Sequence, residues 1–241
     1  MAYTRGSSSN IIVGAAALFA YSGPIGLVTD DQDADYGKIL SEPAGSSQAD
    51  TDLPAYEPSG TVGNLSGSYK DTLEADADYR NVGYTMNGLE VAFQPDFGEV
   101  QVDQVLDVAK LYKQGMQVNL NTAFAESTLE NLLLALVADS DDLDPLTGTG
   151  IGTGSQIMNL SAGDIGDIPL ERGLVAVGPG TGSALAAAEE RVYIAYRALS
   201  IDNVTVAAKR DEATMFEVSF RLLPNDNASY GKIVDRVIAT A

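Results

Sequence analysis

The stretch from Phe97 to Asp139 constrains the fold more than any other part of the chain, because its hydrophobic period changes once. Polar and apolar residues alternate in Gly98–Gln104 and again in Gln117–Phe124. A period of two predicts strands with one solvent-facing side and one buried side. From Ser127 onward the apolar residues recur at helical spacing instead. The stretch therefore predicts two strands followed by a short amphipathic helix.

The predicted helix spans Ser127–Ala138. Ser127 and Glu130 form a capping-box pattern, in which each side chain accepts a hydrogen bond from the backbone N–H of the other. One face of the helix is apolar and carries Leu129, Leu132, Leu133, Leu136 and Val137. We therefore expect this helix to flank a sheet.

Alternation elsewhere predicts further antiparallel strands. Asn87-Gly88 is a hairpin signal, expected to join Tyr79–Thr85 to Leu89–Phe93. Val204–Ala208 is expected to pair with Thr214–Leu222, whose inward residues are Phe216, Val218, Phe220 and Leu222. The remaining predicted strands are Ile11–Tyr21, Ser155–Leu160, Ile168–Val177, Arg191–Ala198 and Lys232–Ile238. The predicted fold is mainly β: two packed antiparallel sheets, as a sandwich or a partly open barrel, with one flanking α-helix.

The chain of 241 residues is predicted to form a single domain, since all-β domains often reach this length. It begins with a polar N-terminal arm at residues 1–9. A long inserted loop at residues 22–78 is rich in Gly, Ser and Pro and has little periodicity. Such a long loop is either functional or disordered. No stretch is expected to span a membrane or to act as a signal peptide.

The chain has no Cys and no His. This removes disulfides, thiolate chemistry, the usual zinc ligands and every Ser-His-Asp arrangement, so no catalytic residue is predicted. The glycine-rich stretch Asp144–Gly154 lacks the Lys-Ser/Thr of a phosphate-binding loop, which predicts a flexible surface loop. The acidic clusters Asp30–Asp35 and Asp139–Asp144 lack the glycine and terminal Glu of a calcium loop. No metal and no cofactor are therefore predicted.

The net charge of −20 comes from 14 basic and 34 acidic residues. This charge argues against binding nucleic acid by neutralising its phosphates. The alternative reading is that an acidic surface keeps the protein soluble. Glu99, Gln101 and Asp103 lie together on one side of the predicted strand, opposite Val100 and Val102.

Several motifs together resemble the major tail tube protein of long-tailed bacteriophages. They are Val102-Asp-Gln after an alternating strand, Ala125-Glu at a strand end, and Ser127-Thr-Leu-Glu-Asn-Leu at a helix start. The final segments Thr214–Pro224 and Tyr230–Asp235 also resemble that family, as does Val13-Gly-Ala-Ala. The similarity covers roughly residues 10–21 and 80–240.

The resemblance implies a structural protein of the virion tail, made in the host cytoplasm, that forms hexameric rings stacked into a tube. Its lumen would pass genomic DNA and the tape measure protein without binding them specifically, and other tail proteins would meet the tube ends. Glu90, Glu99, Gln101 and Asp103 are then the candidates for lining the channel. The candidates for subunit contacts are Ile11, Val13, Ala15, Leu27, Val28, Ile39 and Leu40.

Two other functions remain open from the sequence. One is a related virion component, either the inner tube of a contractile tail or a tail terminator. The other is a soluble β-sandwich that binds carbohydrate or another ligand, which would need exposed aromatic residues on a concave face. Negative-stain microscopy distinguishes them, because tubes or rings indicate the structural role and small uniform particles indicate a binding module.

Overall fold

The computed structural model describes residues 14–21, 68–75, 79–101, 107–137, 142–160, 170–180, 189–207, 210, 214–224 and 229–237. These residues form a mainly β, antiparallel fold, as the sequence predicted. Seven strands of an eight-stranded sheet have the order β2-β1-β7-β8-β9-β4-β3. The eighth strand, β10, pairs with the first part of β8, whereas β9 pairs with its last part. Within the described part, no helix is both long enough and apolar enough to cross a bilayer.

The strands of the large sheet differ widely in length. The short strands are β1 (Ala17–Tyr21), β2 (Tyr79–Asn81), β7 (Arg172–Pro179), β9 (Phe216–Leu223) and β10 (Gly231–Val237). The long strands are β3 (Thr85–Val100), β4 (Lys110–Phe124) and β8 (Glu189–Ser200). A separate small sheet pairs β5 (Leu143–Pro145) with β6 (Gln156–Met158).

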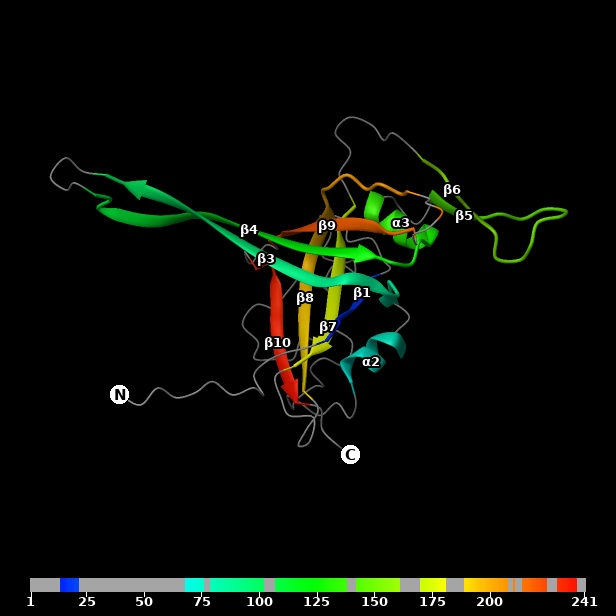
Figure 1. Cartoon of the computed structure of the whole chain (residues 1–241), viewed down its shortest axis with the longest axis horizontal. Helices are drawn as coiled ribbons and strands as arrows, with labels where there is room; N and C mark the ends of the chain where they lie inside the picture. The colour runs from blue at the N-terminus through cyan, green and yellow to red at the C-terminus, as the bar shows by residue number, and fades with distance from the viewer. Residues whose placement is uncertain are drawn as a thin grey trace, which may run out of the picture.

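Strand β8 joins two layers that the sequence predicted as separate sheets. Its first part pairs with β10, and its last residues, Arg197 to Ser200, pair with β9. Figure 1 shows β3, β4 and β9 crossing over the strands β7, β8 and β10. The sheet thus folds over itself at β8, and the two halves pack face to face.

The main core lies between these two layers. Alternate residues of β9 point into it, and the predicted inward set of Phe216, Val218, Phe220 and Leu222 is buried, as expected. Phe124 on β4 packs edge to face on Phe216, with ring centroids 5.5 Å apart. Leu18, Leu174 and Ala195 close the core from the other layer.

A second core lies on the opposite face of β1, β7 and β8, beneath the helix α2 (Tyr69–Ala75). Tyr69 and Leu73 of α2 are fully buried there. The helix is held by Glu190 of β8, whose carboxylate accepts from the Tyr69 N–H at 2.9 Å and from the Ser68 hydroxyl at 2.9 Å. The prediction of a loop at residues 22–78 is therefore wrong for 68–75; residues 22–67 and 76–78 lie outside the described residues.

Two predicted hairpins are absent from the described residues because strand pairing elsewhere overrides the local turn signals. Asn87 and Gly88 do adopt positive φ, 65° and 73°. They form an irregularity within β3, however, because β4 pairs with β3 on both sides of them. Val204–Val206 forms no strand, and β9 pairs with β4 and β8 instead.

The helix α3 (Leu129–Leu136) occupies the predicted helical stretch and flanks the sheet. Its N-cap is Thr128 rather than the predicted Ser127, and the Thr128 hydroxyl accepts from the Asn131 N–H at 3.2 Å. Val137 ends the helix in the left-handed conformation, with its N–H bonded to the Leu133 carbonyl. The Asn131 side chain is held by Arg80 of β2 and by the carbonyls of Val82 and Glu126, as described below.

Candidate assembly surfaces and polar face

The outer face of β3, β4 and β9 is polar along its whole width. Residues directly opposite each other in a sheet point to the same side. Glu90 lies opposite Asn121, and Asn121 lies opposite Ser219. The Ser219 hydroxyl donates to the Asn121 side-chain oxygen at 2.7 Å. The intervening residues, such as Leu120 and Phe220, point into the core.

A hollow of about 720 Å³ is centred on this polar face. Its side chains are mostly amides and carboxylates and include Asn87, Glu90, Asn119, Asn121, Asp202, Asn203 and Glu217. Arg221 lies on the same face opposite Asn119, so the acidic character is local to the hollow. Three carboxylates without a lining Lys or Arg repel an approaching phosphate. This surface therefore favours exclusion of anions over binding them.

The predicted channel residues are only partly brought together. Glu90 lies in the hollow, whereas Glu99 and Gln101 lie near the far end of the β3–β4 hairpin. At the rise of a strand, nine residues place Glu90 and Glu99 roughly 30 Å apart. Asp103 lies outside the described residues.

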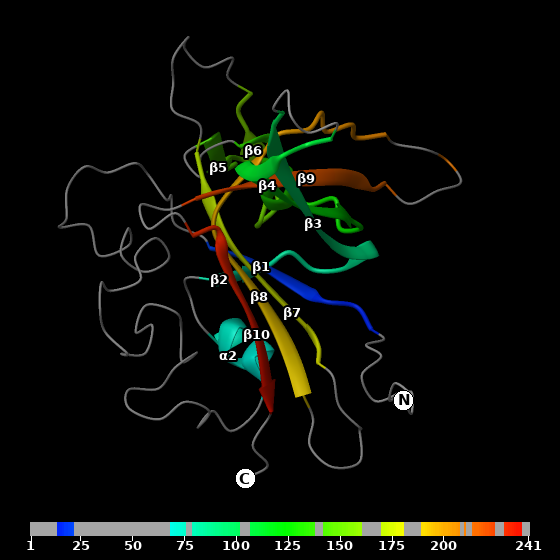
Figure 2. The same cartoon turned by 90° about the vertical axis from the view of Figure 1, so that its left-hand side faces the viewer.

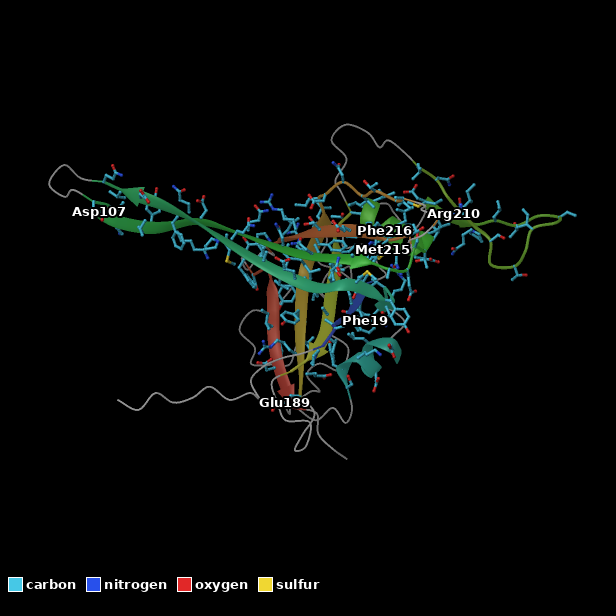
Figure 3. All side chains as sticks on the ribbon, in the orientation of Figure 1. Phe19, Asp107, Glu189, Arg210, Met215 and Phe216 are labelled. Carbon is cyan, nitrogen blue, oxygen red and sulfur yellow. The ribbon has the colours of Figure 1, made fainter. Side chains whose placement is uncertain are left out.

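The β3–β4 hairpin projects well beyond the layer beneath it (Figure 1), and Asp107 lies at its far end (Figure 3). Its outer half carries apolar side chains that the described residues leave uncovered: Phe97 is 55% exposed, Leu111 60% and Tyr112 46%. Glu99 lies opposite Leu111, and Val100 lies opposite Lys110. The prediction that this strand has one solvent-facing side and one buried side is thus wrong in the outer half of the hairpin. A register shift between Asp96 and Phe97 mixes polar and apolar residues on both faces.

An apolar groove of about 330 Å³ opens at the base of this hairpin. It runs between β3 and β4 on one side and β8 and β10 on the other, and its lining includes Val91, Met116 and Tyr193. The Tyr230 hydroxyl donates to the Met116 carbonyl at 2.6 Å and so ties the two sides together. Phe93 and Ile233, 53% and 54% exposed, form an apolar rim.

A polar cluster beneath α3 was missed by sequence reasoning. Asn131, only 1% exposed, donates to the carbonyls of Val82 at 2.8 Å and Glu126 at 3.0 Å. Its side-chain oxygen accepts from Arg80 Nη1 at 2.7 Å. Burial lowers the pKa of Arg80, an effect that nearby Glu130 opposes. Asn131 shares its buried side of α3 with Leu134 and Ala135, three and four residues further on, and this spacing was the available signal. The predicted apolar face of α3 is therefore largely wrong, because Leu133 is the only one of its five residues that is buried.

The helix α2 was also missed, although Ser68-Tyr-Lys-Asp71 has the spacing of a capping box and Tyr69 and Leu73 share a helical face. Of the predicted subunit-contact residues, Ala15 is exposed and borders a shallow hollow of about 430 Å³ beside Tyr84. The other contact candidates, Ile11, Val13, Leu27, Val28, Ile39 and Leu40, lie outside the described residues.

The glycine-rich stretch forms the exposed end of the β5–β6 hairpin, so its prediction as a surface loop is confirmed as far as exposure goes. The Asp30–Asp35 cluster lies outside the described residues. Among the residues that the structure does describe, no three acidic side chains are grouped so that they could hold a metal ion.

Comparison with protein-family models finds no match, and comparison with curated proteins finds no significant match. The functional argument therefore rests on the surfaces described above.

Proposed function

We propose that this chain is the repeating subunit of a virion tail tube, which assembles into hexameric rings stacked around a channel for DNA. The observation that carries the proposal is the projecting hairpin. A strand pair with Phe97, Leu111 and Tyr112 exposed is costly in water, since burying one such side chain is worth about 1.5–3 kcal/mol. Copies of the same chain would provide the missing cover.

The sheet edges that the described strands leave unpaired support self-assembly. Strands β3 and β2 end the order of the large sheet, and β10 pairs only with β8 among the described strands. Open edges invite pairing with another chain. In a heterologous contact the two copies use different surfaces. Copies related by a rotation then close into a ring, and rings stacked by repeated translation build a tube.

The polar face of β3, β4 and β9 supports the proposal that these strands line the channel. If β3, β4 and β9 line the lumen, the hollow with Glu90, Asp202 and Glu217 faces the passing DNA. At short range, carboxylates repel phosphates, and this repulsion keeps the DNA from adhering. Glu90 is therefore the strongest channel candidate, whereas Glu99 and Gln101 sit where the hairpin would meet a neighbouring copy.

The test compares the wild-type protein with Leu111→Asp and with the control Ile201→Asp. Both positions are exposed, 60% and 45%, so either substitution is expected to change folding stability by less than about 0.5 kcal/mol. Wild type and Ile201→Asp should form tubes or rings in negative-stain micrographs. Leu111→Asp should remain as folded small particles, because a carboxylate would be buried in the contact.

Two outcomes would contradict the proposal: a wild-type protein that stays monomeric at every concentration, or a Leu111→Asp variant that assembles normally. The channel assignment is tested separately by a cryo-EM map of the tubes. Glu90 side chains on the outside of the tube would rule out this lining.

A further inference from the structure

The β5–β6 hairpin is a second projection, at the opposite end of the molecule from the β3–β4 hairpin (Figure 1). Residues 145–160 contain no charged side chain, in a chain with 34 acidic and 14 basic residues. Leu146, Ile151 and Ile157 are 41%, 38% and 43% exposed along it. This projection is therefore an uncharged, partly apolar surface on a strongly acidic protein.

The projection is held firmly at its base. The Leu146 N–H donates to the Ser155 carbonyl at 2.8 Å, and the Asn159 N–H donates to the Asp142 carbonyl at 2.8 Å. Gln156 Nε2 donates to Glu130 Oε1 of α3 at 2.9 Å, and this bond lowers the pKa of Glu130. A segment ordered before binding loses less conformational entropy when it docks.

The apolar groove between the β3–β4 base and β10 lies on the other side of the body. Figures 1 and 2 both place β5 and β6 away from β10. The loop between β5 and β6 therefore does not fill the groove of its own chain. The described lining of the groove is mostly apolar, and its polar groups are those of Ser229 and Lys232 and the hydroxyls of Tyr193 and Tyr230. An uncharged apolar segment therefore suits it better than the charged tip region of the β3–β4 hairpin does.

We propose that the loop between β5 and β6 of one copy inserts Leu146 and Ile151 into the apolar groove of a second copy. The inference rests on the proposed self-assembly and specifies one of its contacts. Each copy carries a net charge of −20, so a contact made through uncharged residues avoids the strongest repulsion between copies. Because the loop and the groove are different surfaces on opposite sides of the body, the contact is heterologous and can link neighbours around a ring.

The absence of cysteine from the chain permits a direct test. Ile151→Cys and Ile233→Cys are introduced together, which puts one thiol on the loop and one on the groove rim. A short bismaleimide reagent then links thiols without the strict geometry that a disulfide needs. The control carries Ile151→Cys with Val206→Cys, because Val206 is 46% exposed but does not line the groove.

We expect the Ile151→Cys/Ile233→Cys variant to give a ladder of cross-linked oligomers on a denaturing gel. The fraction of cross-linked protein should be at least tenfold higher than in the control. Micrographs of the same samples separate this inference from the proposed function: tubes without the ladder overturn the docking alone, whereas failure of all samples to assemble overturns the function. A different outcome is that no ladder forms and that the wild-type protein floats with phosphatidylcholine vesicles while Ile151→Asp does not. This outcome would identify a lipid surface as the partner and would also overturn the docking.

Discussion

Replacing Asn131 by Ala should destabilise the protein more than replacing Glu130, the other polar residue of α3. The side chain makes two neutral hydrogen bonds, to the carbonyls of Val82 and Glu126, and one charge-assisted bond with Arg80. A neutral bond contributes about 0.5–1.5 kcal/mol and a charged one about 1.5–3 kcal/mol. Alanine recovers roughly 0.5 kcal/mol through its higher helix propensity. Together these ranges give a net loss of about 2–5.5 kcal/mol, with a central value of about 3–4 kcal/mol.

Urea unfolding followed by circular dichroism measures this loss. With a denaturant slope of about 2–3 kcal/mol/M, the midpoint should fall by roughly 1–2 M. Asn119→Ala is the matched control, because Asn119 is half-buried on the polar face and should change stability by less than about 0.5 kcal/mol. A double-mutant cycle with Arg80→Met should give a coupling of about 1.5–3 kcal/mol.

The reasoning is refuted if Asn131→Ala costs less than about 1 kcal/mol, or if its effect adds to that of Arg80→Met without coupling. Either result would mean that water satisfies the Val82 and Glu126 carbonyls and the Arg80 guanidinium once the amide is gone. Asn131 would then be a solvent-replaceable contact instead of the link between β2, the β2–β3 connection and α3.

Two further predictions concern carboxylates on or beside β8. Glu190→Gln should cost about 1.5–3 kcal/mol and speed amide hydrogen exchange in α2. The substitution replaces one carboxylate oxygen by an NH2 group that cannot accept, and it removes the charge that strengthens the bonds from the Tyr69 N–H and the Ser68 hydroxyl, which now go to different oxygens. Unchanged exchange at Tyr69, or an equal effect of the exposed control Glu217→Gln, would contradict this prediction. Asp235→Asn should cost only about 0.2–1 kcal/mol at pH 7, since Asp235 is 53% exposed. The hydrogen bonds from Arg191 lower the pKa of Asp235 from 3.8, so the cost is full above about pH 4 and disappears as the pH falls through the lower folded-state pKa. Thermal melts at pH 7 and about pH 2 measure the difference, and an equal cost at both values would exclude the ion pair as its source.

The sequence alone determined the features that depend on local periodicity. The alternation of Phe216, Val218, Phe220 and Leu222 fixed a half-buried strand, because side chains of a strand point to opposite faces in turn. The leucine spacing after Thr128 fixed the position of α3 to within two residues at each end. Both patterns act over less than a dozen residues, so no distant contact was needed to read them.

Only the tertiary structure decided which segments pair and where the surfaces lie. Asn87-Gly88 has the dihedrals of a turn, yet pairing with β4 on both sides continues the strand through it. The helix α2 is held by Glu190, which is 121 residues away from Tyr69, and the Asn131 side chain of α3 donates to the Val82 carbonyl, 49 residues away. Strand pairing and these contacts depend on the free energies of long-range burial and hydrogen bonding, which exceed the local turn and capping preferences. Such long-range contacts produce no periodic pattern in the sequence.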